Sequence, residues 1–309
     1  MKLRYVFGPI PSRRLGVSLG IDLTPGKQCT LNCLYCECGS TDDLTLERRE
    51  YVPTREVLEE LRAVLREGPE LDSITFSGSG EPTLHSGIGD VIAMLKEEFP
   101  RYRVTVLTNS TLLGDADVRA ALLRADLVVP SLDAVSEEVF RKINRPRRGI
   151  SSAELIEGLH RFSHEYCGEL WLEVFIIPGI NDGDEEVALF RDTIARLRCT
   201  RVQLNSLDRP GAVEWIQAMP RENLEAIAHR LGPAVEVIGK AVLRHRCVAY
   251  SEDVEQRILN VLRVRPCTID DLAEGLQLHA LDVGKYLDVL LAEGKIRSRL
   301  ENRGRFYLL

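Results

Sequence analysis

Short apolar runs alternate with amphipathic segments along the first two thirds of the chain. The apolar runs are typical of buried strands, whereas the segments between them repeat apolar residues every three or four positions, as helices do. We expect strands at 17–23, 73–76, 103–108, 127–131, 170–177 and 202–205. We expect helices at 57–65, 88–99, 115–124, 137–143, 152–162 and 185–197.

The repeated strand-then-helix order predicts a parallel sheet joined by right-handed crossovers. Six such units are too few for a closed eight-stranded barrel. The predicted fold is therefore α/β, a partial (βα)6 TIM-like barrel. In a full barrel of this kind the active site lies at the carboxyl ends of the strands, and we expect the same here.

The pattern changes near residue 251. Three amphipathic segments follow there, and then two short strand-like runs on either side of a turn at 302–304. The expected helices are 254–262, 268–275 and 281–291, and the expected strands are 295–300 and 305–309. Three helices and a hairpin are typical of a small winged-helix domain. The sequence therefore predicts two domains, a barrel at 1–250 and a C-terminal winged helix at 251–309.

Composition narrows the function classes. The formal net charge of −7 does not favour a broad nucleic-acid-binding surface. No apolar stretch approaches the roughly 20 residues that span a bilayer, and the N-terminus does not resemble a signal peptide, so we expect a cytoplasmic protein without membrane contact. Thiols stay reduced in that compartment, which makes disulfides among the eight cysteines improbable.

Cys29, Cys33 and Cys36 have the spacing C-x3-C-x2-C directly after the first predicted strand. Three thiolates on a four-iron cube leave one iron open for a further ligand, so the motif predicts a [4Fe-4S] cluster that binds a small molecule. The alternative is a structural zinc site with Cys38 as the fourth ligand. Tyr35 lies beside Cys36 and is expected to cover the cluster or its ligand, or simply to pack in the core.

The motif Cys-Thr-Leu-Asn-Cys-Leu-Tyr-Cys at 29–36 resembles the signature of the radical S-adenosylmethionine (SAM) superfamily. The narrower likeness is to wyosine-base-synthase-like proteins, and the segments that carry it are 7–16, 75–83, 131–133, 143–146 and 203–211. The resemblance implies that the cluster cleaves SAM reductively to a 5′-deoxyadenosyl radical, which abstracts hydrogen from a substrate. It also implies an external one-electron donor such as a flavodoxin or ferredoxin.

A glycine-rich segment follows the second predicted strand. Gly78 and Gly80 would let backbone carbonyls approach a ligand closely, and Glu81 adds a negative charge. The resemblance implies that this segment binds the amino group of SAM. The alternative interpretation is an ordinary glycine-rich turn between a strand and a helix.

Polar side chains follow three further predicted strands. Asn109 follows the third strand, Ser131 and Asp133 lie at the end of the fourth, and Asn205 ends the sixth, where it could face SAM or substrate. Their amide, hydroxyl and carboxylate groups can bond to the ribose or carboxylate of SAM. The same residue types are also common in turns and helix caps, so both roles stay open.

Three substrate classes stay open: RNA, a peptide or protein, and a small metabolite. Arg13 and Arg14 suit a phosphate or carboxylate, although a structural salt bridge explains the pair equally well. Asp208 and Arg209 are further candidates for substrate contact. Residues 251–309 could dock a peptide, protein or nucleic acid.

A different class of function is an iron–sulfur DNA-binding sensor that acts through the winged helix. The predicted hairpin is rich in positive charge, which favours this alternative. Its cationic residues are Lys295, Arg297, Arg299, Arg303 and Arg305. The complete set of SAM-site residues favours an enzyme instead.

Overall fold

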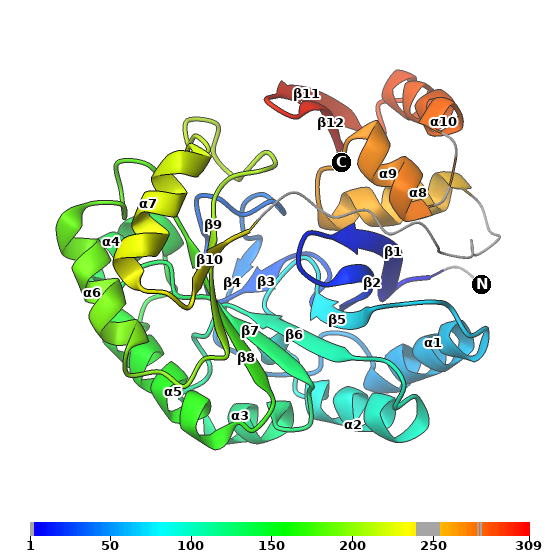
Figure 1. The fold of residues 1–309 in the computed structure, drawn as a ribbon. Coiled ribbons are helices and arrows are strands. Elements are labelled where there is room, and N and C mark those ends of the chain that lie inside the picture. The colour runs from blue at the N-terminus through cyan, green and yellow to red at the C-terminus, as the bar shows by residue number, and fades with distance from the viewer. Residues whose placement is uncertain (1–2, 239–253, 277, 279) are drawn as a thin grey trace.

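The computed structural model describes residues 3–238, 254–276, 278 and 280–309 (Figure 1). A curved sheet of eight strands lies at its centre. In spatial order the strands are β1 (Val6–Ser12), β2 (Gly16–Asp22), β5 (Ser73–Ser77), β6 (Val104–Thr108), β7 (Leu127–Pro130), β8 (Glu169–Phe175), β9 (Arg201–Asn205) and β10 (Val235–Val237).

The strands from β2 to β10 pair in parallel, and β1 pairs antiparallel with β2 at one edge. The six predicted strands correspond to β2, β5, β6, β7, β8 and β9, and the predicted α/β partial barrel is confirmed. The sequence did not indicate the two edge strands. Glycine and proline interrupt β1, and β10 is only three residues long, so neither produces a recognisable apolar run.

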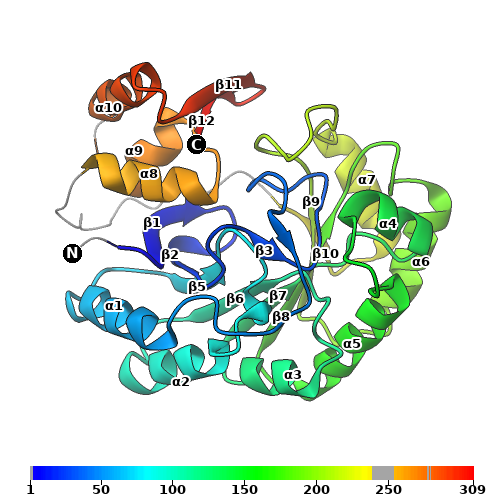
Figure 2. The ribbon, with the colours of Figure 1, turned by 180° about the vertical axis from the view of Figure 1, so that it is seen from behind.

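Helices lie around the outer face of the curved sheet, as Figures 1 and 2 show. They are α1 (Thr54–Arg66), α2 (Ile88–Glu98), α3 (Ala116–Leu122), α4 (Glu137–Asn144), α5 (Ser152–Glu165), α6 (Asp184–Ile194) and α7 (Arg221–Leu231). The first six match the predicted helices, and α7 was not predicted. In α1 the apolar residues Val57, Leu61 and Val64 recur at helical spacing and are buried in the core.

The C-terminal part contains three helices followed by an antiparallel hairpin, in the predicted order. They are α8 (Val254–Val264), α9 (Ile269–Leu276), α10 (Ala280–Ala292), β11 (Arg297–Glu301) and β12 (Gly304–Leu308). Thr268 caps α9, because its hydroxyl accepts a hydrogen bond from the Asp271 N–H at 3.1 Å. The predicted boundary at residue 250 lies outside the described residues, so the division into two domains stays a prediction.

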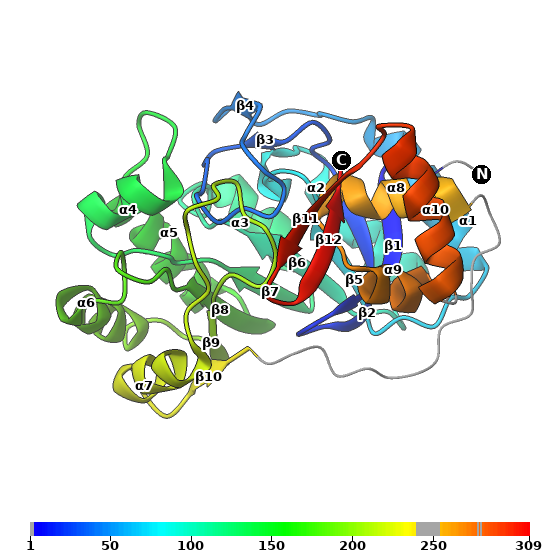
Figure 3. The same cartoon turned by 90° about the horizontal axis from the view of Figure 1, so that it is seen from above.

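The C-terminal helices pack against β1, as Figure 3 shows from above. Phe7 and Ile10 of β1 belong to the same buried apolar cluster as Ile258, Leu272 and other residues of these helices. Gly20 of β2 makes room for the Phe7 ring, since a Cβ there would lie 2.1 Å from Phe7 Cζ. The C-terminal helices therefore pack over the edge of the sheet at β1. No helix in the described part of the chain could cross a membrane.

Phe7 should hold the C-terminal helices on the barrel. We expect Phe7→Ala to lower the free energy of unfolding by about 3–5 kcal/mol, because the change leaves a cavity between two packed elements. Urea denaturation monitored by circular dichroism measures this effect. The matched control is Leu300→Ala, at a side chain that is 77% exposed, which should change stability by less than about 0.5 kcal/mol. Equal midpoints for the two variants would contradict the assignment.

Candidate active site

The three motif cysteines lie on the loop that leaves the carboxyl end of β2. Backbone hydrogen bonds fix this loop to α4, from Asn32 N–H to the Asn144 carbonyl and from Leu34 N–H to the Ile143 carbonyl, both at 2.9 Å. Two short strands, β3 (Gln28–Cys29) and β4 (Asp43–Leu44), pair within the loop. The cysteines are therefore held on an ordered segment above the sheet.

Each of the three cysteine sulfurs has a nitrogen donor close by. The Asn109 amide lies 3.4 Å from Cys29 Sγ, the Asn144 amide lies 3.3 Å from Cys33 Sγ, and the Lys27 ammonium lies 3.1 Å from Cys36 Sγ. Such donors stabilise a thiolate. The sequence interpretation found Asn109 but missed Asn144 and Lys27. Asn144 lies in the segment 143–146 that carries the family resemblance, but no role was predicted for it, and Lys27 lies outside those segments. Only the fold brings the two side chains to the sulfurs.

Burial raises the pKa of Cys29 to about 12 and raises that of Cys33 well above its ordinary value. A hydrogen bond from Cys38 and the charge of Lys27 overcome burial at Cys36 and lower its pKa to about 6. Buried thiols of this kind ionise readily only when a cationic partner compensates the charge. The iron atoms of a cluster would supply that compensation, so the three-thiol donor set fits a [4Fe-4S] cluster.

The Cys38 thiol lies beside Cys36 and also contacts two backbone carbonyls. Its sulfur lies 3.3 Å from the Gly78 carbonyl and 2.7 Å from the Val264 carbonyl at the end of α8. Within the described ranges no three His, Cys, Asp or Glu side chains gather closely enough to hold a single metal ion. The zinc alternative with Cys38 as the fourth ligand stays a prediction.

The glycine-rich segment after β5 packs directly on the cysteine loop. A Cβ at Gly80 would lie 1.9 Å from the Gln28 carbonyl oxygen, and the Glu81 N–H donates to that same oxygen at 2.9 Å. Gly78 has a φ of +110°, and a Cβ there would meet the Asp22 carboxylate. The glycines therefore set the height of the cysteine loop above the strands.

Glu81 is buried, and both of its carboxylate oxygens already accept hydrogen bonds from the protein. The donors are the Thr108 hydroxyl at 2.7 Å, the Asn109 N–H at 2.8 Å and the Thr83 N–H at 3.1 Å. Glu81 thus joins the loops after β5 and β6. Its expected contact with the SAM ammonium stays a prediction, and the structure shows a positioning role.

Asp133 is also a buried centre of hydrogen bonds. Its carboxylate accepts from the Tyr35 hydroxyl at 2.5 Å, from the Asn144 amide at 2.8 Å and from the Phe175 N–H at 3.1 Å. Burial raises the pKa of Asp133 to about 6. Since Asn144 also contacts Cys33, Asp133 connects two residues of the cysteine loop, Tyr35 and Cys33. Its predicted bond to SAM stays a prediction.

A cavity of about 280 Å³ lies inside the partial barrel beside the cysteine loop. It brings together Tyr35, Cys36, Gly78, Ser131 and Asn205 of the predicted site residues. The Tyr35 ring stacks on Phe175 in its wall, with centroids 3.9 Å apart. The remaining predicted residues are absent from the lining: Cys29, Cys33, Gly80, Glu81, Asn109 and Asp133.

Charged groups that the sequence interpretation missed complete this cavity. Glu173 of β8 pairs with Arg14 at 2.8 Å and accepts the Asn205 amide at 2.8 Å. Glu37, next to Cys36, pairs with Arg209 at 3.3 Å. Val264 and Arg265 at the end of α8 also line the cavity, so the C-terminal helices form part of its wall.

Comparison with known proteins agrees with this geometry. The sequence profile described as the Radical SAM superfamily matches residues 23–191, which is more than half of the chain and includes all three motif cysteines. The chain belongs to the radical SAM superfamily. Its members are enzymes that use a [4Fe-4S] cluster and SAM, so the predicted class and cofactors are confirmed.

Within the superfamily, the chain is similar over nearly its whole length to proteins named UPF0026. The relative from Methanocaldococcus jannaschii is 31% identical, with 99% of this chain and 96% of the relative covered. The relative from Helicobacter pylori strain J99 is 36% identical, with 99% and 97% covered. A Brachyspira hyodysenteriae protein named GTPase Obg is 34% identical over 98% of this chain, but the chain spans only 45% of its length.

Solved structures share the fold. A radical SAM methyltransferase from Sphaerobacter thermophilus matches with a TM-score of 0.54 and 21% identity, covering 71% of this chain and 66% of that one. Streptococcus suis SuiB bound to its precursor peptide SuiA matches with a TM-score of 0.55 and 16% identity, covering 71% and 48%. At these identities the likeness supports the fold and gives no information about the substrate.

Gly80 should be essential for the placement of the cysteine loop. Because a Cβ at Gly80 would clash with backbone at Gln28, we expect Gly80→Ala to displace Cys29 and to reduce iron incorporation at least severalfold. Iron and sulfide analysis after anaerobic reconstitution measures this. Gly114→Ala is the matched control, since a Cβ at Gly114 meets nothing within 4 Å. A Gly80→Ala protein that loads iron as fully as the control would show that the contact does not matter.

Proposed function

We propose that Cys29, Cys33 and Cys36 hold a [4Fe-4S] cluster and that the barrel cavity beside it binds SAM and a substrate from which a hydrogen atom is abstracted. The observation that carries the proposal is the set of three part-buried thiols, each with its own nitrogen donor, on a loop fixed above the carboxyl ends of the strands. When bound and reduced, the cluster and SAM supply a 5′-deoxyadenosyl radical.

The residues of the chain have the tasks of holding the reactants and excluding water. The stacked rings of Tyr35 and Phe175 cover one side of the cavity with apolar surface. Asp133 fixes the Tyr35 hydroxyl and, through Asn144, the position of Cys33. Ser131 and Asn205 offer a hydroxyl and an amide to the cavity, and we propose that they bond to SAM or substrate.

Radical SAM enzymes need an external electron donor. We propose a flavodoxin- or ferredoxin-like protein for this role. A peptide, protein or nucleic acid bound through 251–309 is the weaker part of the partner prediction, because part of that segment already contacts the barrel.

The structure does not favour a DNA-binding sensor. Several hairpin cations already have partners: Lys295 lies 2.9 Å from Glu255, Arg299 lies 3.0 Å from Glu301, and Arg303 pairs with Asp208 and Asp271. A phosphate backbone would have to compete with these carboxylates for the same guanidinium and ammonium groups. The hairpin is therefore better described as a structural element of the C-terminal part.

The proposal is tested by anaerobic reconstitution with iron and sulfide, followed by reduction in the presence of SAM and chromatography for 5′-deoxyadenosine. We expect the wild-type protein to form 5′-deoxyadenosine and Cys33→Ala to lose formation by orders of magnitude, because one cluster ligand is missing. Cys167→Ala makes the same chemical change at an exposed cysteine and should behave as wild type. Tight zinc binding by wild type without any cluster would overturn the proposal.

A further inference from the structure

The cavity beside the cysteine loop has an excess of positive charge. Two glutamates and four arginines line it, so the formal charge of the lining is +2. The glutamates are Glu37 and Glu173, and the arginines are Arg13, Arg14, Arg209 and Arg265. Just behind the lining, Arg303 bridges Asp208 and Asp271. Counting these three as well, five guanidinium groups face four carboxylates, and one positive charge remains.

The pairing of these groups leaves Arg13 with the weakest interaction. Arg14 pairs with Glu173 at 2.8 Å, and Arg209 pairs with Glu37 at 3.3 Å. The Arg13 side chain is only 17% exposed, yet its nearest carboxylate oxygen, on Asp208, is 3.9 Å away and already bonded to Arg303. In the described part of the chain, no hydrogen bond from the Arg13 guanidinium is found. A mostly buried cation without a close partner is costly unless a ligand completes it.

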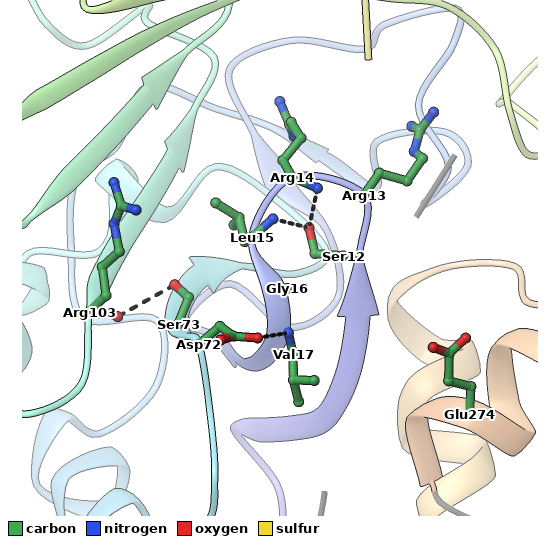
Figure 4. Close-up of a pocket in the computed structure, with 10 residues that line it drawn as sticks. All are labelled: Ser12, Arg13, Arg14, Leu15, Gly16, Val17, Asp72, Ser73, Arg103 and Glu274. Carbon is green, nitrogen blue, oxygen red and sulfur yellow. Dashed lines mark hydrogen bonds between the residues drawn. The ribbon is translucent and has the colours of Figure 1, made fainter. Parts of the chain in front are cut away.

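The turn between β1 and β2 carries Arg13 and separates two cavities. The second cavity, of about 470 Å³, lies at the amino ends of β5 and β6 and is lined by Asp72, Ser73 and Arg103 (Figure 4). Figure 4 shows the guanidinium groups of Arg13 and Arg14 pointing away from Asp72 and Ser73. Both groups therefore extend from the turn away from those residues, and both line the first cavity.

We propose that Arg13 binds an oxyanion group of the substrate, a carboxylate or a phosphate, so that the substrate is a small anionic molecule held between the β1–β2 turn and the cluster loop. A planar guanidinium suits either group because it can donate two parallel hydrogen bonds. The small size follows from the volume of the cavity, about 280 Å³, part of which SAM would occupy. This inference rests on the proposed function, since it names the substrate class of the same cavity.

Calorimetric titration of the reconstituted protein tests the inference, with SAM at saturation and with inorganic phosphate or succinate as the probe. We expect wild type to bind at least one of them at a single site and Arg13→Gln to bind it about tenfold more weakly or worse, because a charged hydrogen bond is lost. Tighter binding of phosphate or of succinate tells a phosphate ester from a carboxylate substrate. Arg103→Gln is the matched control, since Arg103 lines the second cavity and not the first, and it pairs with Glu169.

Three results would overturn the inference: no binding of either anion to wild type, equal affinity in Arg13→Gln, or binding that occurs without SAM and disappears when SAM is added. The last result would assign Arg13 to the carboxylate of SAM. If Arg13→Gln does not fold, Arg13→Lys replaces it. We expect Arg13→Lys to bind the anion severalfold more weakly than wild type, and unchanged binding would contradict the inference. Production of 5′-deoxyadenosine is measured separately. A protein that forms 5′-deoxyadenosine but binds no anion would disprove the role of Arg13 and leave the proposed function standing.

Discussion

The structure depends on holding three ionisable thiols in a place that water reaches poorly. Burial, helped by the nearby carboxylates Glu81 and Asp133, raises the pKa of Cys29 and Cys33, so the site favours neutral thiols until a cationic centre arrives. The protein prepares for that centre with one nitrogen donor at each sulfur, taken from three separate segments: Lys27 on the cysteine loop, Asn109 after β6 and Asn144 at the end of α4. The loop is thereby fixed from several sides.

The same arrangement explains why buried carboxylates surround the cysteines without obvious ligands of their own. Glu81 and Asp133 each accept three or more hydrogen bonds from the protein, and each connects a strand end to a residue that contacts a motif cysteine. A buried carboxylate satisfied in this way is rigid, because moving it would leave several donors unpaired. The hydrogen bonds of these two side chains position the cysteine loop.

The C-terminal helices contribute to the barrel cavity as well as to their own small core. Phe7 and Ile10 on the edge strand are shared with that core, and the end of α8 reaches Cys38 and the cavity wall. A partial barrel is open along one side, and here the C-terminal helices pack along the edge strand β1. This placement reduces the space for a large substrate and agrees with a small one.

The sequence by itself determined the six barrel strands, the strand-then-helix order, the C-terminal run of three helices and a hairpin, and the cysteine motif with its cofactors. These features are local in the chain, since apolar periodicity and ligand spacing can be recognised from neighbouring residues. Only the tertiary structure decided that Lys27 and Asn144 face the sulfurs, that Glu81 is internally bonded, that Arg14 has a partner and Arg13 scarcely does, and that α8 reaches the cavity. Each of these features depends on contacts between segments far apart in the chain or on the direction of a side chain within a crowded interior. A local sequence pattern encodes neither such contacts nor such directions.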